Sequence, residues 1–179
     1  AQAAAQRLAS EVPPVIGFKA DFRNVRWGML MFEVKAAEGL SDGSLVLTDR
    51  GDQALDRDLV VGSTKWKVLY HFNQLECAGG TYVSDIPRSA PDRALDLYFA
   101  AKGALATAYG PPSASDEGMP GPLTKDQVAK VLGEAGVLQV RSFWDKVPGK
   151  VVACALQTEP DSGTSGPLQV FILIARSKT

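Results

Sequence analysis

The chain is poor in the side chains that most often carry catalysis. Among its 179 residues there is one histidine, His71, and there are two cysteines, Cys77 and Cys154. The cysteines form no Cys-x-x-C pair, which disfavours both a zinc site and thioredoxin-type redox chemistry. A Ser-His-Asp or Cys-His device would have to use the single histidine. The composition therefore predicts no catalytic residue, no metal site and no cofactor.

Sequence motifs for common chemistries are also missing. The chain contains no G-x-x-x-x-G-K-[ST] or G-x-G-x-x-G phosphate loop, no G-x-S-x-G elbow and no H-E-x-x-H zinc motif. Aspartates are frequent in residues 42–58, but their spacing is not that of an EF-hand and arginines are interspersed with them. We interpret residues 49–58 as a solvated loop rather than a calcium site.

Neither sign of charge is in excess, and long apolar runs are missing. Lys plus Arg total 19 and Asp plus Glu total 20, which gives a formal net charge of -1. A nucleic-acid-binding protein needs a basic face, so this balance argues against that class. No run of about 18 apolar residues occurs, so we predict that no helix spans a membrane. The length fits one domain with a core of its own.

What is present at the N-terminus is a small, polar start, AQAAAQRLAS. Such a start is typical of a mature chain after removal of a secretory signal, although a trimmed recombinant chain would look the same. We predict a periplasmic or secreted protein with a flexible leader over residues 1–17. In an oxidising compartment Cys77 and Cys154 are expected to form one disulfide. The alternative is two buried thiols that pack as small apolar side chains.

Three segments carry helix signals and six carry strand signals. Helices are expected at residues 29–39, 91–109 and 124–135, the last with a Thr124–Gln127 capping box. Strands are expected at residues 44–49, 59–72, 75–85, 137–145, 150–159 and 168–176. This order predicts an α+β fold, an antiparallel sheet of about six strands with helices packed on one face. One domain is expected over residues 18–179, with helix-plus-meander halves at 18–90 and 91–179.

The clearest strand signal leads into a predicted hairpin. A two-residue turn at residues 73–74 would pair Phe72 with Leu75 and Tyr70 with Cys77. Cys77 would then share the core face of Phe72, whereas His71 would lie on the opposite face. The Gly-Gly pair at residues 79–80 predicts a bulge in the second strand.

Ten positions in residues 18–112 form a pattern of three motifs: an aromatic-x-x-aliphatic-x-W-G-M start before a helix, a Y-x-F strand before a hairpin, and a helix that ends in Y-G-x-P. They are Phe22, Val25, Trp27, Gly28, Met29, Tyr70, Phe72, Tyr109, Gly110 and Pro112. The pattern resembles that of small exported or lipoprotein-type bacterial domains, similar in fold to β-lactamase-inhibitor-like and outer-membrane-assembly lipoprotein modules. The resemblance implies a non-enzymatic envelope protein. Two features depart from it: the apolar run at residues 30–32, where a polar pair is usual, and the additional helix near residues 124–135.

The last expected strand, LQVFILIAR, is apolar on both faces. Leu168, Val170, Ile172 and Ile174 alternate with Phe171, Leu173 and Ala175. Such a strand is either covered on both faces or meets a partner. If helices cover one face only, Phe171 and Leu173 are expected to form an interface for self-association or for a protein partner.

Three functions remain open on these observations. The first, which we favour, is a non-enzymatic protein-binding or scaffolding domain of the cell envelope. The second is an apolar small-molecule or lipid carrier, with aromatic residues of strands 59–72 and 75–85 lining a cavity. The third is an enzyme with an unrecognised site near His71, which requires that histidine to lie in a concave pocket beside an acid.

Overall fold

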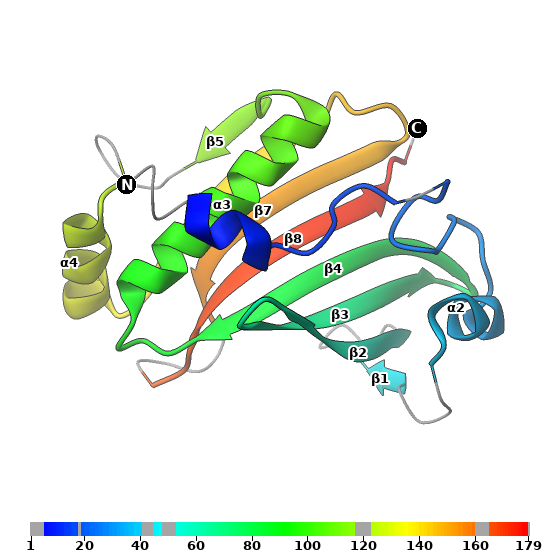
Figure 1. The fold of residues 1–179 in the computed structure, drawn as a ribbon, viewed down its shortest axis with the longest axis horizontal. Coiled ribbons are helices and arrows are strands. Elements are labelled where there is room, and N and C mark those ends of the chain that lie inside the picture. Colours follow the sequence, from blue (N-terminus) through cyan, green and yellow to red (C-terminus); the bar gives the residue numbers. More distant parts are fainter. Residues whose placement is uncertain are drawn as a thin grey trace.

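The protein is described by a computed structural model that covers residues 6–17, 19–40, 45–47, 53–116, 123–159 and 165–178. The described residues form an antiparallel sheet of eight strands in the order β1-β2-β3-β4-β8-β7-β6-β5, with the long helix α3 lying across it (Figure 1). The helical elements are η1 (Ala9–Glu11), α2 (Met31–Glu38), α3 (Pro91–Tyr109) and α4 (Lys125–Ala135). The strands are β1 (Leu45–Leu47), β2 (Gln53–Val61), β3 (Thr64–Asn73), β4 (Glu76–Ile86), β5 (Ala114–Asp116), β6 (Gln139–Trp144), β7 (Lys150–Thr158) and β8 (Leu168–Arg176).

The predicted α+β fold with an antiparallel sheet is confirmed. Helix α3 packs against β4, β7 and β8, and η1 and α4 pack against α3. Its bounds are those expected from Pro91 at the first turn and the glycine after Tyr109. The capping box at the start of α4 is also present, because the Thr124 side chain accepts from the Gln127 N–H at 3.3 Å. The strand expected at residues 44–49 corresponds to the three-residue β1 at one sheet edge. The two strands beyond the expected six are β2 and the three-residue β5, which lies at the other edge.

The prediction of a loop at residues 49–58 is wrong for residues 53–58, the part that the structure describes. The prediction of one strand over residues 59–72 is also wrong, because these residues are divided between β2 and β3. Residues 53–61 form β2, which turns at residues 62–63 and pairs along β3. Gly62 lies in the turn at φ +60°, a conformation that L side chains rarely adopt. The sequence did not indicate this strand because Arg57, which points inward, is charged. Residues 56–58 are therefore polar without the alternation of a half-buried strand.

The β3–β4 hairpin forms, but its predicted pairing is wrong. The turn residues are 74 and 75, so Phe72 pairs with Cys77 rather than with Leu75. Opposite Phe72 the pairing is shifted by two positions, and since strand side chains alternate with period two, Cys77 still faces the core. Opposite Tyr70, which pairs with Gly80 rather than with Cys77, the shift is three positions. The irregularity expected at residues 79–80 occurs immediately before them, at the register shift opposite His71 and Phe72.

The core lies between α3 and the inner face of the sheet. The five largest fully buried side chains come from β3, β4, β6 and α3: Trp66, Tyr70, Tyr82, Trp144 and Tyr98. Their polar ends are hydrogen-bonded in several cases, as buried polar atoms require. The Tyr98 hydroxyl lies 2.9 Å from the Ser142 hydroxyl, and Trp144 Nε1 donates to the Gly110 carbonyl at 2.7 Å.

Residues 9–17 lie on this inner face. Val12 and Val15 join the buried core, and three aromatic side chains donate hydrogen bonds to carbonyl oxygens of this segment. The pairs are Trp66 Nε1 to Glu11 at 2.8 Å, the Tyr82 hydroxyl to Pro14 at 2.9 Å and the Tyr109 hydroxyl to Val15 at 2.7 Å. These bonds fix the path of the segment across the sheet.

The predicted Cys77–Cys154 disulfide is wrong: both residues are buried free thiols. The strand order places β8 between the two cysteines. Cys154 is paired with Ile172 and Ile172 with Tyr82, whereas Cys77 lies at the start of the same strand as Tyr82. The strand spacings therefore separate the two Cα atoms by about 10 Å across the sheet and about 16 Å along it. A disulfide needs Cα atoms within about 7 Å.

Candidate functional site

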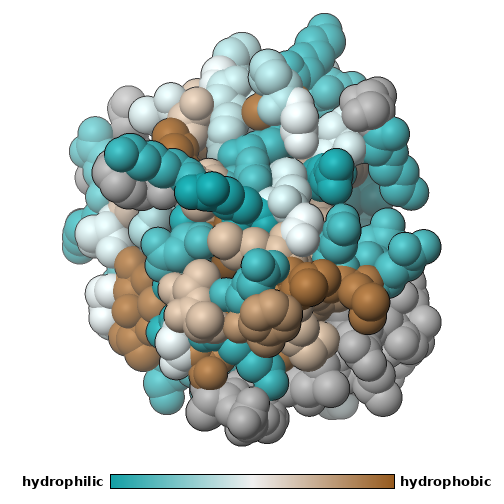
Figure 2. Space-filling model, turned by 90° about the vertical axis from the view of Figure 1, so that its right-hand side faces the viewer, coloured by the Kyte–Doolittle hydropathy of each residue, from teal (hydrophilic) through white to brown (hydrophobic). Residues whose placement is uncertain are grey.

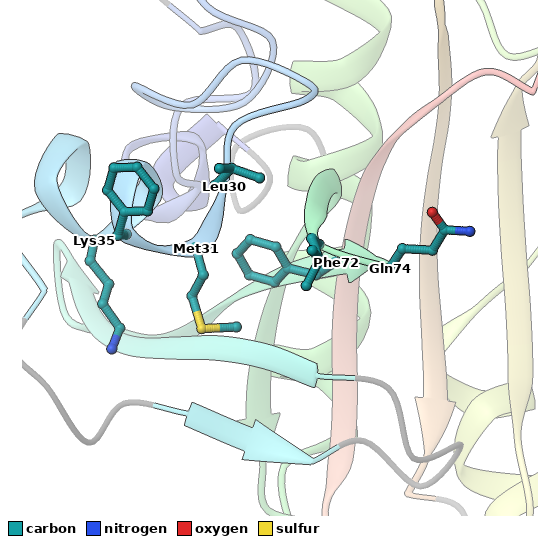
Figure 3. Close-up of a pocket in the computed structure, with 7 residues that line it drawn as sticks. Leu30, Met31, Lys35, Phe72 and Gln74 are labelled. Carbon is teal, nitrogen blue, oxygen red and sulfur yellow. The ribbon is translucent and has the colours of Figure 1, made fainter.

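The candidate site is an apolar groove between α2 and the tip of the β3–β4 hairpin, which we call the α2 groove. Its volume is about 410 Å³, and it is lined by Leu30, Met31, Phe32, Lys35, Phe72, Gln74 and Leu75. Met31 from α2 and Phe72 from β3 point toward one another across it (Figure 3). Figure 2 shows that hydrophobic side chains gather on this end of the molecule.

One wall of the groove is held in place by main-chain pairing. The Gly28 N–H donates to the Cys77 carbonyl at 2.9 Å, and the Cys77 N–H donates to the Met29 carbonyl at 2.8 Å. The pairing of β4 with β8 reaches Gly79. The segment before α2 pairs with the residues of β4 that precede Gly79, through the bridge between Leu30 and Glu76. Helix α2 begins directly afterwards, with the Leu30 N–H donating to the Glu33 side chain at 2.7 Å.

The other wall is the hairpin turn. Gln74 adopts φ +58°, in the left-handed region, and Leu75 follows it at the tip. Leu75 is 73% exposed, whereas Phe72, three residues earlier, is 6% exposed and forms the floor. The turn therefore holds a large apolar side chain in water beside a buried aromatic ring.

The chemistry of the α2 groove suits binding rather than acid–base catalysis. Of the seven residues that line it, only Lys35 is charged. In addition, two of the apolar side chains that line the groove are in contact with water: Phe32 is 67% exposed and Leu30 is 38% exposed. Clustered large apolar side chains in water mark an interaction surface, because their burial against a partner is favourable.

Beneath α2 lies a buried ion cluster that sequence reasoning did not detect. The Glu38 side chain is 1% exposed and accepts from Arg23 Nε at 3.2 Å and from Arg57 Nη1 at 3.3 Å. The Asn24 N–H also donates to it, at 3.1 Å. Two cations and an N–H compensate this carboxylate, so it ties α2 to β2 and to the turn at residues 23–24. Since Arg23 and Arg57 lie 15 and 19 positions from Glu38 in the sequence, no local motif could reveal the cluster.

Two tyrosines lie beside the ion cluster. Burial raises the pKa of Tyr70, and the Glu38 charge raises it further, while Arg23 opposes both effects. Burial likewise raises the pKa of Tyr82 to about 12. Both phenols therefore stay protonated at neutral pH and act here as core side chains.

His71 lies away from both the groove and the ion cluster. It is half-buried on the outer face of the sheet, and its Nε2 lies 2.7 Å from the Thr81 hydroxyl. Cys77 faces the opposite side, because it is paired with the neighbouring Phe72. The structure thus places Cys77 and His71 on opposite faces of the sheet, as the sequence predicts.

Phe171 and Leu173 lie where the alternation predicts, on the face turned away from α3. Both are half-buried, while Ile172 between them is fully buried in the core. Among the acidic residues considered for calcium, Asp56 and Asp58 lie in β2, and residues 42, 49 and 52 fall outside the described ones. The described residues hold no group of three potential metal ligands.

The sequence contained one signal for the α2 groove. The run at residues 30–32 is apolar throughout at the start of an expected helix, and two of its members, Leu30 and Phe32, are exposed here. Their partner across the groove, Leu75, carried no such signal because it was expected to pair with Phe72 inside the hairpin.

The chain matches no family model, no curated protein and no solved structure. The resemblance to exported bacterial domains therefore stays a prediction. Within the described residues, no helix combines the length and the apolar character that crossing a membrane requires.

Proposed function

We propose that the protein is a non-enzymatic protein-binding domain whose α2 groove takes an apolar peptide segment of a partner. The observation that carries this proposal is the exposure of Leu30, Phe32 and Leu75 around one groove. Burying a side chain of this size contributes about 1.5–3 kcal/mol, so three of them supply the centre of an interface.

The open shape of the groove favours a peptide over a whole small molecule. A pocket that binds a small molecule usually buries most of the surface of that ligand. Here the side chains at the rim, Phe32 and Leu75, keep most of their own surface in water. Such a rim suits two or three anchoring side chains of a longer chain. Lys35 on α2 favours a segment with an acidic residue beside those anchors.

Selection from a displayed library of random peptides tests the proposal. We expect enrichment of sequences with two or three large apolar residues and a neighbouring acid. A synthetic peptide of that consensus should bind the protein about tenfold more weakly after Leu75→Ser or Phe32→Ser, because each change removes an anchor contact.

Val137→Ser is the matched control, because Val137 is an exposed apolar residue, 61% exposed, that does not line the groove. It should leave binding unchanged. Failure to enrich any peptide, or equal loss of binding in all three variants, contradicts the proposal. A retained fatty acid found by native mass spectrometry, and lost in the Leu75 variant, would favour the carrier function instead.

The envelope location remains a prediction from the N-terminal composition. Fractionation of a bacterial host that expresses the full-length gene tests it. Recovery in the cytoplasmic fraction would contradict it, and that outcome would leave the peptide-binding proposal unaffected.

A further inference from the structure

Residues 9–17, which we call the N-terminal segment, cross the inner face of the sheet beside α3 (Figure 1). Among the described residues, no strand pairing or bridge includes a position of this segment. Pro13 and Pro14 have no N–H, so the segment cannot complete a strand ladder. Val12 is extended, at φ -90° and ψ 129°, and a residue before proline is restricted to this region. The local sequence therefore sets the conformation of the segment before it docks.

The sheet and α3 hold this segment in a channel lined by aromatic side chains, which we call the inner channel. Trp66, Tyr82 and Tyr109 each donate a side-chain hydrogen bond to one carbonyl oxygen of the segment, at 2.7–2.9 Å. Aromatic grooves bind proline-rich peptides in the same way. All three bonds go to the main chain, so they require the extended conformation of the segment and not its attachment to the same molecule.

Few side chains of the segment are buried. Val12 and Val15 are each 9% exposed and Pro13 is buried between them, whereas Pro14 and Ile16 are exposed. Each residue that is fixed in a segment costs conformational entropy, and here three buried side chains offset that cost. The segment is therefore bound in its channel as a ligand is, through a small number of contacts that are lost together.

An empty inner channel is unfavourable, which determines what can replace the segment. Trp66 is 2% exposed and Tyr82 is 0% exposed, and both would meet water if the segment left. The segment of a second copy would make every contact that the first one makes. These contacts include the hydrogen bonds that Glu11 accepts from Ser63 and Thr64. Exchange between two copies therefore loses no contact of the channel.

The turn after the segment is tight and strained. Lys19 adopts φ 51°, in the left-handed region that residues other than glycine rarely enter. A Cβ atom at Gly17 would lie 2.6 Å from the Ala20 carbonyl oxygen, so the turn has no room for a side chain there. A short connection under strain favours exchange, because the strain is released when the connection extends toward another molecule.

We propose that two copies of this chain exchange their N-terminal segments, so that residues 9–17 of each copy fill the inner channel of the other. The turn at Gly17, Lys19 and Ala20 is the hinge, and it extends in the exchanged dimer. Each copy keeps its fold, and the segment in its channel forms the interface. The inner channel and the α2 groove share no lining residue, so this proposal does not depend on peptide binding in that groove.

Sedimentation equilibrium of the full chain tests the exchange. We expect a species of twice the chain mass of 19.0 kDa. Lys19→Pro should raise the dimer fraction, because the proline ring excludes a positive φ and with it the closed turn. Lys19→Gly should weaken dimerisation by about tenfold, because glycine adopts this φ without strain. Gln74→Gly is the matched control: Gln74 has φ 58° in the β3–β4 turn, outside the hinge, so its replacement should leave dimerisation unchanged.

A peptide of residues 8–17 stands in for the second copy in a direct test of the channel. The full chain with Val12→Ser and Val15→Ser has a weakened segment of its own. It should bind the peptide about 100-fold more tightly than the wild type, whose attached segment competes at a millimolar effective concentration. Adding Tyr109→Phe should weaken binding by about fivefold, because one hydrogen bond is lost. A peptide with Ile16→Ser should bind equally well, since Ile16 is 60% exposed.

Three outcomes overturn the proposal. The first is a single species of 19.0 kDa at every concentration. The second is a doubly substituted chain that does not bind the peptide or, if it is unfolded alone, does not refold with it. The third is a dimer that persists in Lys19→Gly and dissociates with Phe171→Asp, which would place the second copy on the sheet face turned away from α3. Leu75→Ser should change neither dimerisation nor binding of this peptide, so failure of the α2 groove to bind peptides leaves the proposal standing.

Discussion

At the scale of single residues, Gly80 is the glycine with the least room for a side chain among those that the structure describes. A Cβ atom at this position would lie 2.1 Å from Phe22 Cδ1. The Phe22 ring cannot easily move, because it packs against Tyr82 at 5.0 Å between ring centroids and against Tyr70 at 5.8 Å. The glycine is therefore required for the approach of the segment before α2 to the sheet.

Gly80→Ala should destabilise the protein by about 1–3 kcal/mol, the usual cost of overpacking a core. Gly103→Ala is the matched control, since Gly103 is exposed in α3 and a Cβ there meets nothing within 4 Å. That change should stabilise the protein by about 0.5–1 kcal/mol through helix propensity. Urea denaturation measures both, and equal effects of the two substitutions would contradict the packing assignment.

At the scale of elements, Glu11 joins η1 to the β2–β3 turn and to α3. Its carboxylate accepts from the Thr64 hydroxyl, from the Ser63 hydroxyl at 2.8 Å and from Arg93 Nη2 at 3.1 Å. The hydrogen bond from Thr64, then that from Ser63 and then the Arg93 charge hold the Glu11 pKa below its ordinary value of 4.5.

This pKa makes the docking of η1 dependent on pH. Because the folded pKa lies below the unfolded one, Glu11 stabilises the fold above pH 4.5, and that contribution is lost as the pH falls through the folded pKa. Glu11→Gln should lower the melting temperature at neutral pH and flatten its decline below pH 4.5. Glu134→Gln, at an exposed position of α4, should leave the decline unchanged. If the melting temperature of the Glu11 variant falls with pH as that of the wild type does, the hydrogen bonds and the ion pair of Glu11 do not contribute to stability.

At the scale of the whole molecule, the strand order separates the two cysteines for which the sequence predicts a disulfide. Cys77 and Cys154 both point into the inner core, but on strands that β8 keeps apart. Burial raises the pKa of Cys77 to about 11 and that of Cys154 to about 12. Both are therefore unreactive neutral thiols in the folded protein.

Alkylation followed by intact-mass measurement should label neither cysteine in the native state. After denaturation without reductant both should be labelled, because no disulfide withholds them. Absence of labelling in the denatured protein would reveal a bridge and contradict the strand order. Labelling of the native protein at one position would show that this part of the core opens.

Local sequence determined the elements whose signals lie within a few residues. Pro91 and the glycine after Tyr109 set the ends of α3, and the alternation from Trp66 to Phe72 set the inward face of β3, since these effects act through neighbouring backbone and side-chain geometry. The same alternation placed Phe171 and Leu173 on the outer face.

Only the tertiary structure decided what depends on contacts distant in the chain. Strand β2 forms because it pairs with β3 and because Arg57 donates a hydrogen bond to Glu38. The polar sequence of β2 indicates neither contact. The α2 groove arises where the residues before α2 pair with β4, about 50 positions later in the chain. Period and capping are local properties, whereas strand order and the partner of a buried charge depend on the packing of the complete sheet.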